Sequence, residues 1–422
     1  MTARITRLDI EGLRSIDKLS LDLGPMNVLI GENGSGKTTV LEALDLLRKA
    51  ATLPGEQFVQ SLYEAHGGVA LIRNTPGEGR RRLKLGVTIV PGGSLNHRYE
   101  LTLEASAQGY FRIAGESFRL VPRRDTSGSS LKVFERDGQT GVVHNQATGQ
   151  FDQLTLSATD VLLSLQGNGR VSLAADQANP STPYLRNLLA SSTIYPAFEL
   201  NPAWARRPSD PPAAMRAGVV IQPARSLERG GANLPNAFHE LRNRGAEAWS
   251  RVIETLQLGL GHDLVDVITE PSPSGGTIGL ALVWKSVGSV PAFALSDGQL
   301  AFLAFVAISE LEADRDGVVG FDEPDLHQHP AMIGRTVALC ERLSERRTIV
   351  IATHSDRLLD ALTDPADAVV LFERDRNGAT IARRPSRAWL DKWLTDYSGL
   401  GGARAEGYGG VIFTEPAEAP SS

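Results

Sequence analysis

The chain has 422 residues, of which 41% are hydrophobic and 22% are charged, as in ordinary globular proteins that bury a sizeable core. Its 43 Lys and Arg against 49 Asp and Glu leave a net charge of −6, so composition alone does not indicate a nucleic-acid-binding protein. The single cysteine, Cys340, excludes an internal disulfide framework and a zinc ribbon and is typical of a reducing compartment, so we expect a cytoplasmic protein.

The first predicted elements are two strands, a glycine-rich loop and a helix. Residues 4–10 and 26–30 have the pattern of strands, and the second is almost entirely apolar, as a strand covered on both faces should be. From Thr38 onward, four apolar side chains recur with helical spacing. This order predicts a strand, a loop and a helix packed directly behind the loop.

The middle of the chain changes character twice. Residues 82–90, 97–105 and 131–136 alternate polar and apolar side chains between glycine-rich turns, which predicts antiparallel hairpins in a β-rich lobe. Three later stretches have helical patterns, and a proline-rich segment interrupts them, which predicts a helical insertion with a mobile loop near 201–216. The helical stretches are 156–165, 183–191 and 234–258.

The C-terminal half returns to strands and then alternates helices with strands, which indicates parallel strands joined by crossover helices. Its expected strands are 264–270, 277–285, 317–321 and 348–352, and its expected helices are 296–313, 330–345 and 356–362. We therefore expect four parts: 1–150 and 261–397 as the two halves of one domain, 151–260 as a helical lid, and 398–422 as a tail. No run of about 18 apolar residues predicts a membrane span, and no heptad pattern predicts a coiled-coil arm.

A phosphate-binding loop follows the second strand. Residues 31–38 read G-E-N-G-S-G-K-T and match G-x-x-x-x-G-K-[ST] between a predicted strand and a predicted helix, which is the context that the motif requires. In such a loop backbone N–H groups surround a β-phosphate, Lys37 reaches the β- and γ-phosphates, and Thr38 offers its hydroxyl to Mg²⁺. The alternative is a glycine-rich turn that merely precedes Lys and Thr. The candidate ATP-binding residues are Asn33, Gly34, Ser35, Gly36, Lys37, Thr38 and Thr39.

Two carboxylates follow a later apolar strand. Asp322 and Glu323 come directly after residues 318–321, and the carboxyl end of a buried parallel strand is where ligands bind in such sheets. Asp322 can hold Mg²⁺, directly or through water, and Glu323 can act as the general base on the attacking water. An exposed acidic turn is the alternative, and the phosphate loop elsewhere in the chain favours the catalytic interpretation.

Two further motifs precede expected helices. In L-S-D-G-Q, Ser296, Gly298 and Gln299 lie at a helix N-terminus and form either a second anion site or an ordinary N-cap. His354, in T-H-S, ends another buried strand and can hydrogen-bond a γ-phosphate. A lone histidine there is more often structural, but one strand-helix-strand step separates it from Asp322, so the two strands can be neighbours.

Other chemistries fit the residues less well. His327, His329 and His354 with Asp322 and Asp325 suggest zinc, but H-x-H spacing is a poor match to known zinc sites. The basic clusters are more simply explained as solvated surface than as a nucleic-acid track. These clusters are Arg80-Arg81-Arg82, Arg123-Arg124 and Arg206-Arg207.

The phosphate loop, L-S-D-G-Q, F-D-E-P and T-H-S, in this order, resemble the ABC-type ATPase head of the SMC, RecF and OLD group. Residues 322–330 look like the D-E-P-E-x-x-L-H-P of the small AAA-type ATPases in that group, and residues 231–235 resemble their G-x-N-L stretch. Residues 12–16 resemble the N-terminal arginine turn, which adds Arg14 as a nucleotide-binding candidate. The resemblance implies an α/β P-loop NTPase fold with a parallel core sheet, an antiparallel β-lobe and a helical lid.

The chain departs from the family pattern at several positions. Asp325 stands where Glu is usual and Gln328 where Leu is usual, while Gln57 and Gln60 are the candidates for the metal-sensing glutamine. No acidic D-x-D set follows Ser355, so we expect no built-in nuclease.

The resemblance further implies a homodimer or higher oligomer around two nucleotides, in which Lys37 and Thr38 of one subunit and Ser296 and Gly298 of the other bind each ATP. Lys37, Glu323 and His354 would be catalytic, and turnover would gate a DNA-linked or effector-linked event in repair or anti-phage defence. One rival is an ATP-dependent scaffold for a separately encoded effector such as a nuclease, with little turnover. Another is a transporter ATPase subunit, which would normally carry L-S-G-G-Q. Assays with and without double-stranded DNA separate a DNA-gated enzyme from a scaffold.

Overall fold

The structure is a computed structural model that describes residues 3–73, 81–91, 95–123, 130–165, 179–198, 200, 213–271, 275–390 and 400–403. Most of the loop expected near 201–216 lies outside these residues, as does the tail expected at 398–422 apart from residues 400–403. None of the described helices is long and apolar enough to cross a membrane.

The chain forms two compact units and passes between them several times. The first unit contains Met1–Ile194, Asp316–Gly320 and Val370–Arg384. The second contains Tyr195–Arg315, Phe321–Val369 and Pro385–Ser422.

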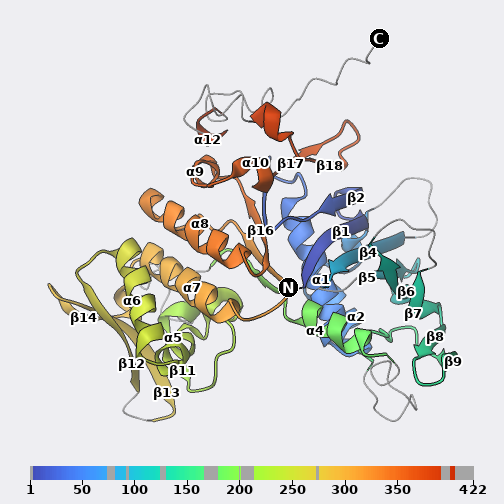
Figure 1. Cartoon of the computed structure of the whole chain (residues 1–422), viewed down its shortest axis with the longest axis horizontal. Helices are drawn as coiled ribbons and strands as arrows, with labels where there is room; N and C mark the ends of the chain where they lie inside the picture. The colour runs from blue at the N-terminus through green and yellow to red at the C-terminus, as the bar shows by residue number, and fades with distance from the viewer. Residues whose placement is uncertain are drawn as a thin grey trace. The chain divides into compact units, whose positions relative to one another are not determined.

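An eight-stranded sheet dominates the first unit, and every neighbouring pair in its order β2-β1-β4-β5-β6-β7-β8-β9 is antiparallel. Figure 1 shows β1, β4, β5 and β6 following one another. On β4, Leu83, Leu85, Val87 and Ile89 are fully buried, the period of two that sequence alternation predicts. The antiparallel lobe is therefore confirmed. Its strands are β1 (Arg4–Leu13), β2 (Ile16–Asp22), β4 (Arg81–Val90), β5 (Leu95–Ala105), β6 (Phe111–Pro122), β7 (Leu131–Asp137), β8 (Thr140–Asn145) and β9 (Gln150–Thr155).

Buried charged side chains hold the segment that follows this sheet. The carboxylate of Glu116 accepts backbone N–H groups of residues 162–163 at 2.6 and 2.9 Å. Arg136 donates to the Ser157 carbonyl at 2.6 Å. The helix predicted over 156–165 is wrong, because side chains of the sheet satisfy backbone groups that a helix would have paired.

The pH dependence of stability should report on Glu116. Its burial raises the pKa of the carboxyl from 4.5 to about 7. The folded state therefore binds an extra proton between these values, so the stabilisation is present below pH 4.5 and is lost as the pH rises through 7. We expect the free energy of unfolding of the wild type to fall relative to that of Glu116→Gln by an amount on the order of 3 kcal/mol over this range. Denaturant titrations at several pH values measure it.

Glu11→Gln, at an exposed position of β1, is the matched control and should leave the wild-type slope unchanged. Equal slopes for Glu116→Gln and the wild type would contradict the assignment. Comparing slopes avoids the offset that a glutamine causes, since its NH₂ group cannot accept from a backbone N–H.

The other elements of the first unit include β3 and α1, which lie on either side of the phosphate loop in the chain. Strands β3, β17 and β18 are neighbours in this order, and β17 and β18 are antiparallel. The apolar face predicted after Thr38 is buried in α1, which confirms that helix. The elements are β3 (Met26–Gly31), α1 (Lys37–Thr52), α2 (Gly55–Glu64), η1 (Gly68–Leu71), α4 (Ser181–Ala190), β10 (Thr193–Tyr195), β17 (Val369–Arg374) and β18 (Thr380–Arg383).

A small antiparallel sheet with two helices forms one part of the second unit. Strand β13 pairs with β11, β12 and β14, and α5 and α6 contact β12. The single helical stretch predicted over 234–258 is divided at Gly245, whose φ of 105° favours glycine. The elements are η3 (Ala214–Arg216), β11 (Val219–Val220), η4 (Arg229–Gly231), α5 (Leu234–Asn243), α6 (Ala246–Leu260), β12 (Leu264–Pro271), β13 (Thr277–Trp284), β14 (Gly288–Pro291) and η5 (Ala292–Ala294).

The helix and strand alternation predicted for residues 296–362 is confirmed. Helix α7 is buried on nearly all sides, and Figure 1 shows it beside α8. The buried pair Glu312 and Arg347 ties the end of α7 to the chain entering β16. The elements are α7 (Asp297–Glu312), β15 (Val318–Asp322), α8 (Pro330–Ser344), β16 (Thr348–Thr353), α9 (Asp356–Asp360), α10 (Pro365–Ala368) and α12 (Leu400–Ala403).

Candidate functional site

The phosphate loop belongs to the first unit, and its glycines are sterically required. A Cβ on Gly31 would lie 2.0 Å from the Phe372 carbonyl oxygen of β17. Gly36 has a φ of 107°, and a Cβ there would lie 2.4 Å from Thr380 Oγ1 of β18. The loop is thus held closely against two strands by positions that only glycine can occupy.

The polar groups of the loop fit a phosphate. Lys37 is 4% exposed, and its Nζ donates to the carbonyls of Gly31 at 2.8 Å and Glu32 at 3.0 Å. The buried Ser35 hydroxyl has no hydrogen-bond partner among the described residues. Gly36, the N-cap of α1, provides no side-chain cap for the helix N–H groups. A bound phosphate would supply acceptors for these donors and a counter-charge for Lys37.

The remaining loop residues differ in exposure. Asn33, Gly34 and Thr38 are exposed, whereas Thr39 is buried. Arg374, at the end of β17, donates from Nε to the Gly34 carbonyl at 2.8 Å. This arginine was not predicted, because nothing in the sequence links residue 374 to a loop 340 positions earlier.

Arg14 lies against α1. Its φ of 49° is left-handed, and its Nη2 donates to Glu42 Oε1 at 2.8 Å and to the His66 carbonyl at 3.1 Å. Although burial opposes the shift, hydrogen bonds from Arg14 and His66 hold the pKa of Glu42 below its usual value. The metal-sensing candidates Gln57 and Gln60 are exposed on α2.

In the second unit, the predicted general base lies beside the predicted histidine. Glu323 follows β15 with a φ of 49°, and its backbone N–H donates to the Ala352 carbonyl of β16 at 2.8 Å. His354 Nε2 lies 3.2 Å from Glu323 Oε1. The ends of β15 and β16 therefore bring Glu323 and His354 together, with Asp322 at the end of β15.

The residues that depart from the family pattern have contacts of their own. Asp325 accepts from Thr353 Oγ1 at 2.6 Å. Gln328 donates to the Pro324 carbonyl at 2.7 Å and accepts from Thr336 at 2.7 Å. Both side chains thus shape the turn after Glu323. Within the described ranges, no group of three His, Cys, Asp or Glu side chains is placed to hold a metal ion.

The L-S-D-G-Q segment opens α7 with a reciprocal cap. Ser296 Oγ accepts from the Gln299 N–H at 3.3 Å, and Gln299 Oε1 accepts from the Ser296 N–H at 2.9 Å. A Cβ on Gly298 would lie 3.2 Å from the His327 carbonyl oxygen. The segment is therefore a helix cap, and it lies against the turn that follows Glu323.

Of the basic clusters, the structure describes Arg81, Arg82 and Arg123, and Arg81 is exposed. Arg82 lies 3.7 Å from the Glu104 carboxylate, and Arg123 donates to the Pro91 carbonyl. Arg80, Arg124, Arg206 and Arg207 lie outside the described residues.

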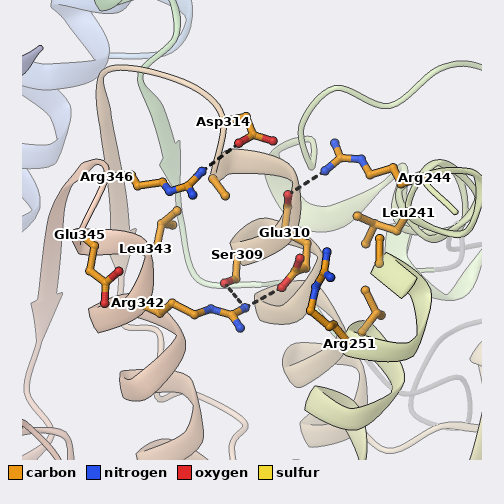
Figure 2. A pocket seen from close by; sticks show the side chains of 13 residues that line it. Leu241, Arg244, Arg251, Ser309, Glu310, Asp314, Arg342, Leu343, Glu345 and Arg346 are labelled. Atoms are coloured by element: carbon orange, nitrogen blue, oxygen red, sulfur yellow. Dashed lines mark hydrogen bonds and ion pairs between the residues drawn. The ribbon is translucent and has the colours of Figure 1, made fainter. Parts of the chain in front are cut away.

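A separate pocket of about 520 Å³ lies among α5, α6, α7 and α8, and Figure 2 shows the side chains that line it. Arg342 contacts Glu310 at 2.6 Å and Arg346 contacts Asp314 at 3.0 Å, while α5, α7 and α8 all end at its wall. Carboxylates and helix C-termini thus balance the arginines, so the pocket is a poor anion site. The charged residues that line it are Arg244, Arg251, Glu310, Asp314, Arg342, Glu345 and Arg346.

Comparison with known proteins identifies similar sequences. A family model described as "AAA domain, putative AbiEii toxin, Type IV TA system" matches residues 26–360. The OLD nuclease of Thermus scotoductus is 42% identical over 43 residues, which are 10% of this chain and 8% of that protein. The DNA replication and repair protein RecF of Pseudomonas savastanoi pv. phaseolicola is 39% identical over 74 residues, 16% of this chain and 20% of that protein. The matches thus span a fifth or less of these two relatives.

A solved structure described as the SmcHead bound to the C-winged helix domain of ScpA has a similar fold. The TM-score is 0.53 at 14% sequence identity, and the match covers 92% of this chain and 99% of that chain. The fold is therefore that of an ABC-type P-loop ATPase head, as the order of the motifs predicts.

Proposed function

The chain belongs to this AAA domain family and is an ATPase head of the SMC, RecF and OLD group, and from this premise we propose that it binds ATP with Mg²⁺, dimerises around two nucleotides and hydrolyses ATP. The observation that carries the proposal is the complete phosphate loop, with its buried lysine, its unpartnered buried serine hydroxyl and its uncapped helix N-terminus. These donors suit the β- and γ-phosphates of a nucleotide.

Each site residue has its own role in the proposed reaction. Lys37 and the loop N–H groups would bind phosphate oxygens, and Thr38 and Asp322 are the residues that would hold Mg²⁺. The bound metal ion would neutralise charge on the phosphates. Glu323 accepts the proton of the attacking water, and His354, 3.2 Å from it, orients that carboxylate or contacts the γ-phosphate.

Exposed apolar side chains near the L-S-D-G-Q segment (residues 295–299), which we call the signature turn, support a dimer. Phe293 precedes the L-S-D-G-Q segment and is 61% exposed, and Leu326, in the turn that approaches Gly298, is 46% exposed. Leaving such side chains in water forgoes the free energy of burying their apolar area. A second subunit that places ATP against Ser296 and Gly298 would cover both.

The event that turnover gates is proposed by likeness to the relatives. One is named for DNA replication and repair, another is a nuclease, and the solved Smc head is bound to a domain of another protein. We infer that ATP-driven dimerisation here controls a DNA-linked or effector-linked event of repair or defence in the cytoplasm.

The variant Ser296→Arg tests the composite site, in which the phosphate loop of one subunit and the signature turn of the other bind one ATP. A bulky cation at the cap should block the opposite nucleotide, so ATP-dependent dimerisation and turnover should both be lost, while ATP binding by the monomer changes little because Lys37 and the loop are untouched. Mixing this variant with Lys37→Ala should restore activity through one intact pair of half-sites per heterodimer. Gel filtration with ATP and a phosphate-release assay measure these effects.

Ser296→Ala is the milder control, which removes the cap hydroxyl without adding bulk or charge. If Ser296→Arg hydrolyses ATP at the wild-type rate as a monomer, the segment is an ordinary helix cap and the proposed dimer around two nucleotides is wrong.

A further inference from the structure

A buried arginine holds the signature turn in place at the start of α7. Arg216 ends η3, and its side chain is 4% exposed. Its Nη1 donates to the carbonyls of Leu295 at 2.7 Å and Phe293 at 3.1 Å, and its Nε donates to the Leu200 carbonyl at 3.1 Å. Its Nη2 pairs with the carboxylate of Asp297, the first residue of α7.

These contacts surround Ser296 without touching it. Leu295 and Asp297, the residues on either side, are both bound to Arg216. A guanidinium is planar, and its donors have fixed directions, so it sets the orientation of several acceptors at once. A lysine ammonium lacks this planar set of donors and cannot make the same contacts. The position of the Ser296 hydroxyl therefore depends on Arg216.

The pair also explains how an acidic residue is tolerated in L-S-D-G-Q. A carboxylate in the first turn of a helix is favourable for the helix itself, but it would repel a phosphate bound at the same N-terminus. Asp297 is 29% exposed, so solvent screens it only in part. The buried guanidinium of Arg216 compensates that charge locally.

We infer that Arg216 is a positioning residue for the signature turn: it fixes the backbone around Ser296 and neutralises Asp297, so that the turn can accept the γ-phosphate of the opposite subunit. This inference rests on the proposed function. A misplacement of about 1 Å in a catalytic site can lower turnover by roughly 10²-fold. The nucleotide held by the phosphate loop, in contrast, does not depend on Arg216.

The test is a mutant cycle between the two residues. We expect Arg216→Met to lower kcat by about 10²-fold while monomer affinity for ATP changes by less than about 2-fold. Asp297→Asn should lower kcat by less than Arg216→Met does, because the asparagine amide oxygen can still accept a hydrogen bond from Arg216. The double variant Arg216→Met/Asp297→Asn should recover about 10-fold over Arg216→Met, because the uncompensated carboxylate is gone. A merely structural role for Arg216 would give no such recovery, and lack of recovery overturns the inference.

Two controls keep the test decisive. Arg251→Met removes a 58% exposed arginine of the same unit and should be silent. Cys340 is buried, so its protection from thiol reagents shows that each variant is folded. If Arg216→Met does not fold, Arg216→Lys is tested instead. We expect Arg216→Lys to lower kcat by about 10-fold, because lysine keeps the charge but lacks the planar set of guanidinium donors. Wild-type turnover in the folded arginine variant overturns the inference.

Ser296→Arg in the same assay separates this inference from the proposed function. If Ser296→Arg is inactive and the Arg216 variants are fully active, only the inference fails. If Ser296→Arg is active, the composite site fails, and hydrogen exchange at residues 296–300 then decides: faster exchange in Arg216→Lys than in the wild type supports positioning of the turn, and equal exchange overturns it.

Discussion

Replacing Lys37 by alanine should abolish ATP binding or turnover, with a loss of at least about 10²-fold, the usual effect of removing one preorganised electrostatic contact. The ammonium group of Lys37 donates hydrogen bonds to two carbonyls of the loop, at 2.8 and 3.0 Å. Without it the phosphates lose their point-charge partner inside a cradle whose backbone is unchanged. Calorimetric ATP titration and phosphate release measure the two parts of the effect.

The fold of Lys37→Ala should survive, because residue 37 begins α1 and alanine is the most favourable helix residue. Lys18→Ala, at an exposed position of β2, is the matched control and should bind and hydrolyse ATP normally. Equal ATPase rates for wild type and Lys37→Ala, with contaminating activity removed, would refute the central proposal.

Replacing Glu323 by glutamine should slow hydrolysis by roughly 10²-fold or more while ATP binding is kept, since general-base assistance is typically worth 10² to 10⁴. Glutamine has nearly the same shape but cannot take up a proton. It can still contact His354, which lies 3.2 Å from the Glu323 carboxylate. Because the variant still binds ATP but hydrolyses it slowly, an ATP-bound dimer should accumulate, which gel filtration detects. Single-turnover kinetics measure the rate of hydrolysis.

Asp314→Asn is the matched acid-to-amide control, since Asp314 is 75% exposed and contacts Arg346 beyond the C-terminal end of α7. It should hydrolyse ATP at the wild-type rate. If Glu323→Gln does so as well, the base lies elsewhere, and Glu323 is a structural residue at a strand end.

Local chemistry made much of this protein predictable from its sequence. The phosphate loop, the strand before it and α1 behind it are contiguous, so spacing and periodicity define them without any long-range contact. The same holds for β15 with Asp322 and for β16 with His354, because a short apolar run followed by a polar residue is a local signal. The capping box at Ser296 also needs only four residues.

Tertiary contacts decided the rest. The helix expected over 156–165 does not form, because Glu116 and Arg136 bind its backbone from the sheet. Arg14 lies on Glu42, and Arg374 reaches Gly34 from 340 positions away.

Arg216 is the clearest case of a residue that only the fold could identify. In the sequence it is one basic residue beside a proline-rich loop, 81 positions from Asp297. No local pattern distinguishes an arginine that is buried among carbonyls from one in solvent, since its partners are backbone oxygens that every residue carries. The sequence by itself predicted the motifs that we propose to bind phosphate and to carry the carboxylates, because those signals are short-range. The structure alone decided which distant side chains hold these motifs in place.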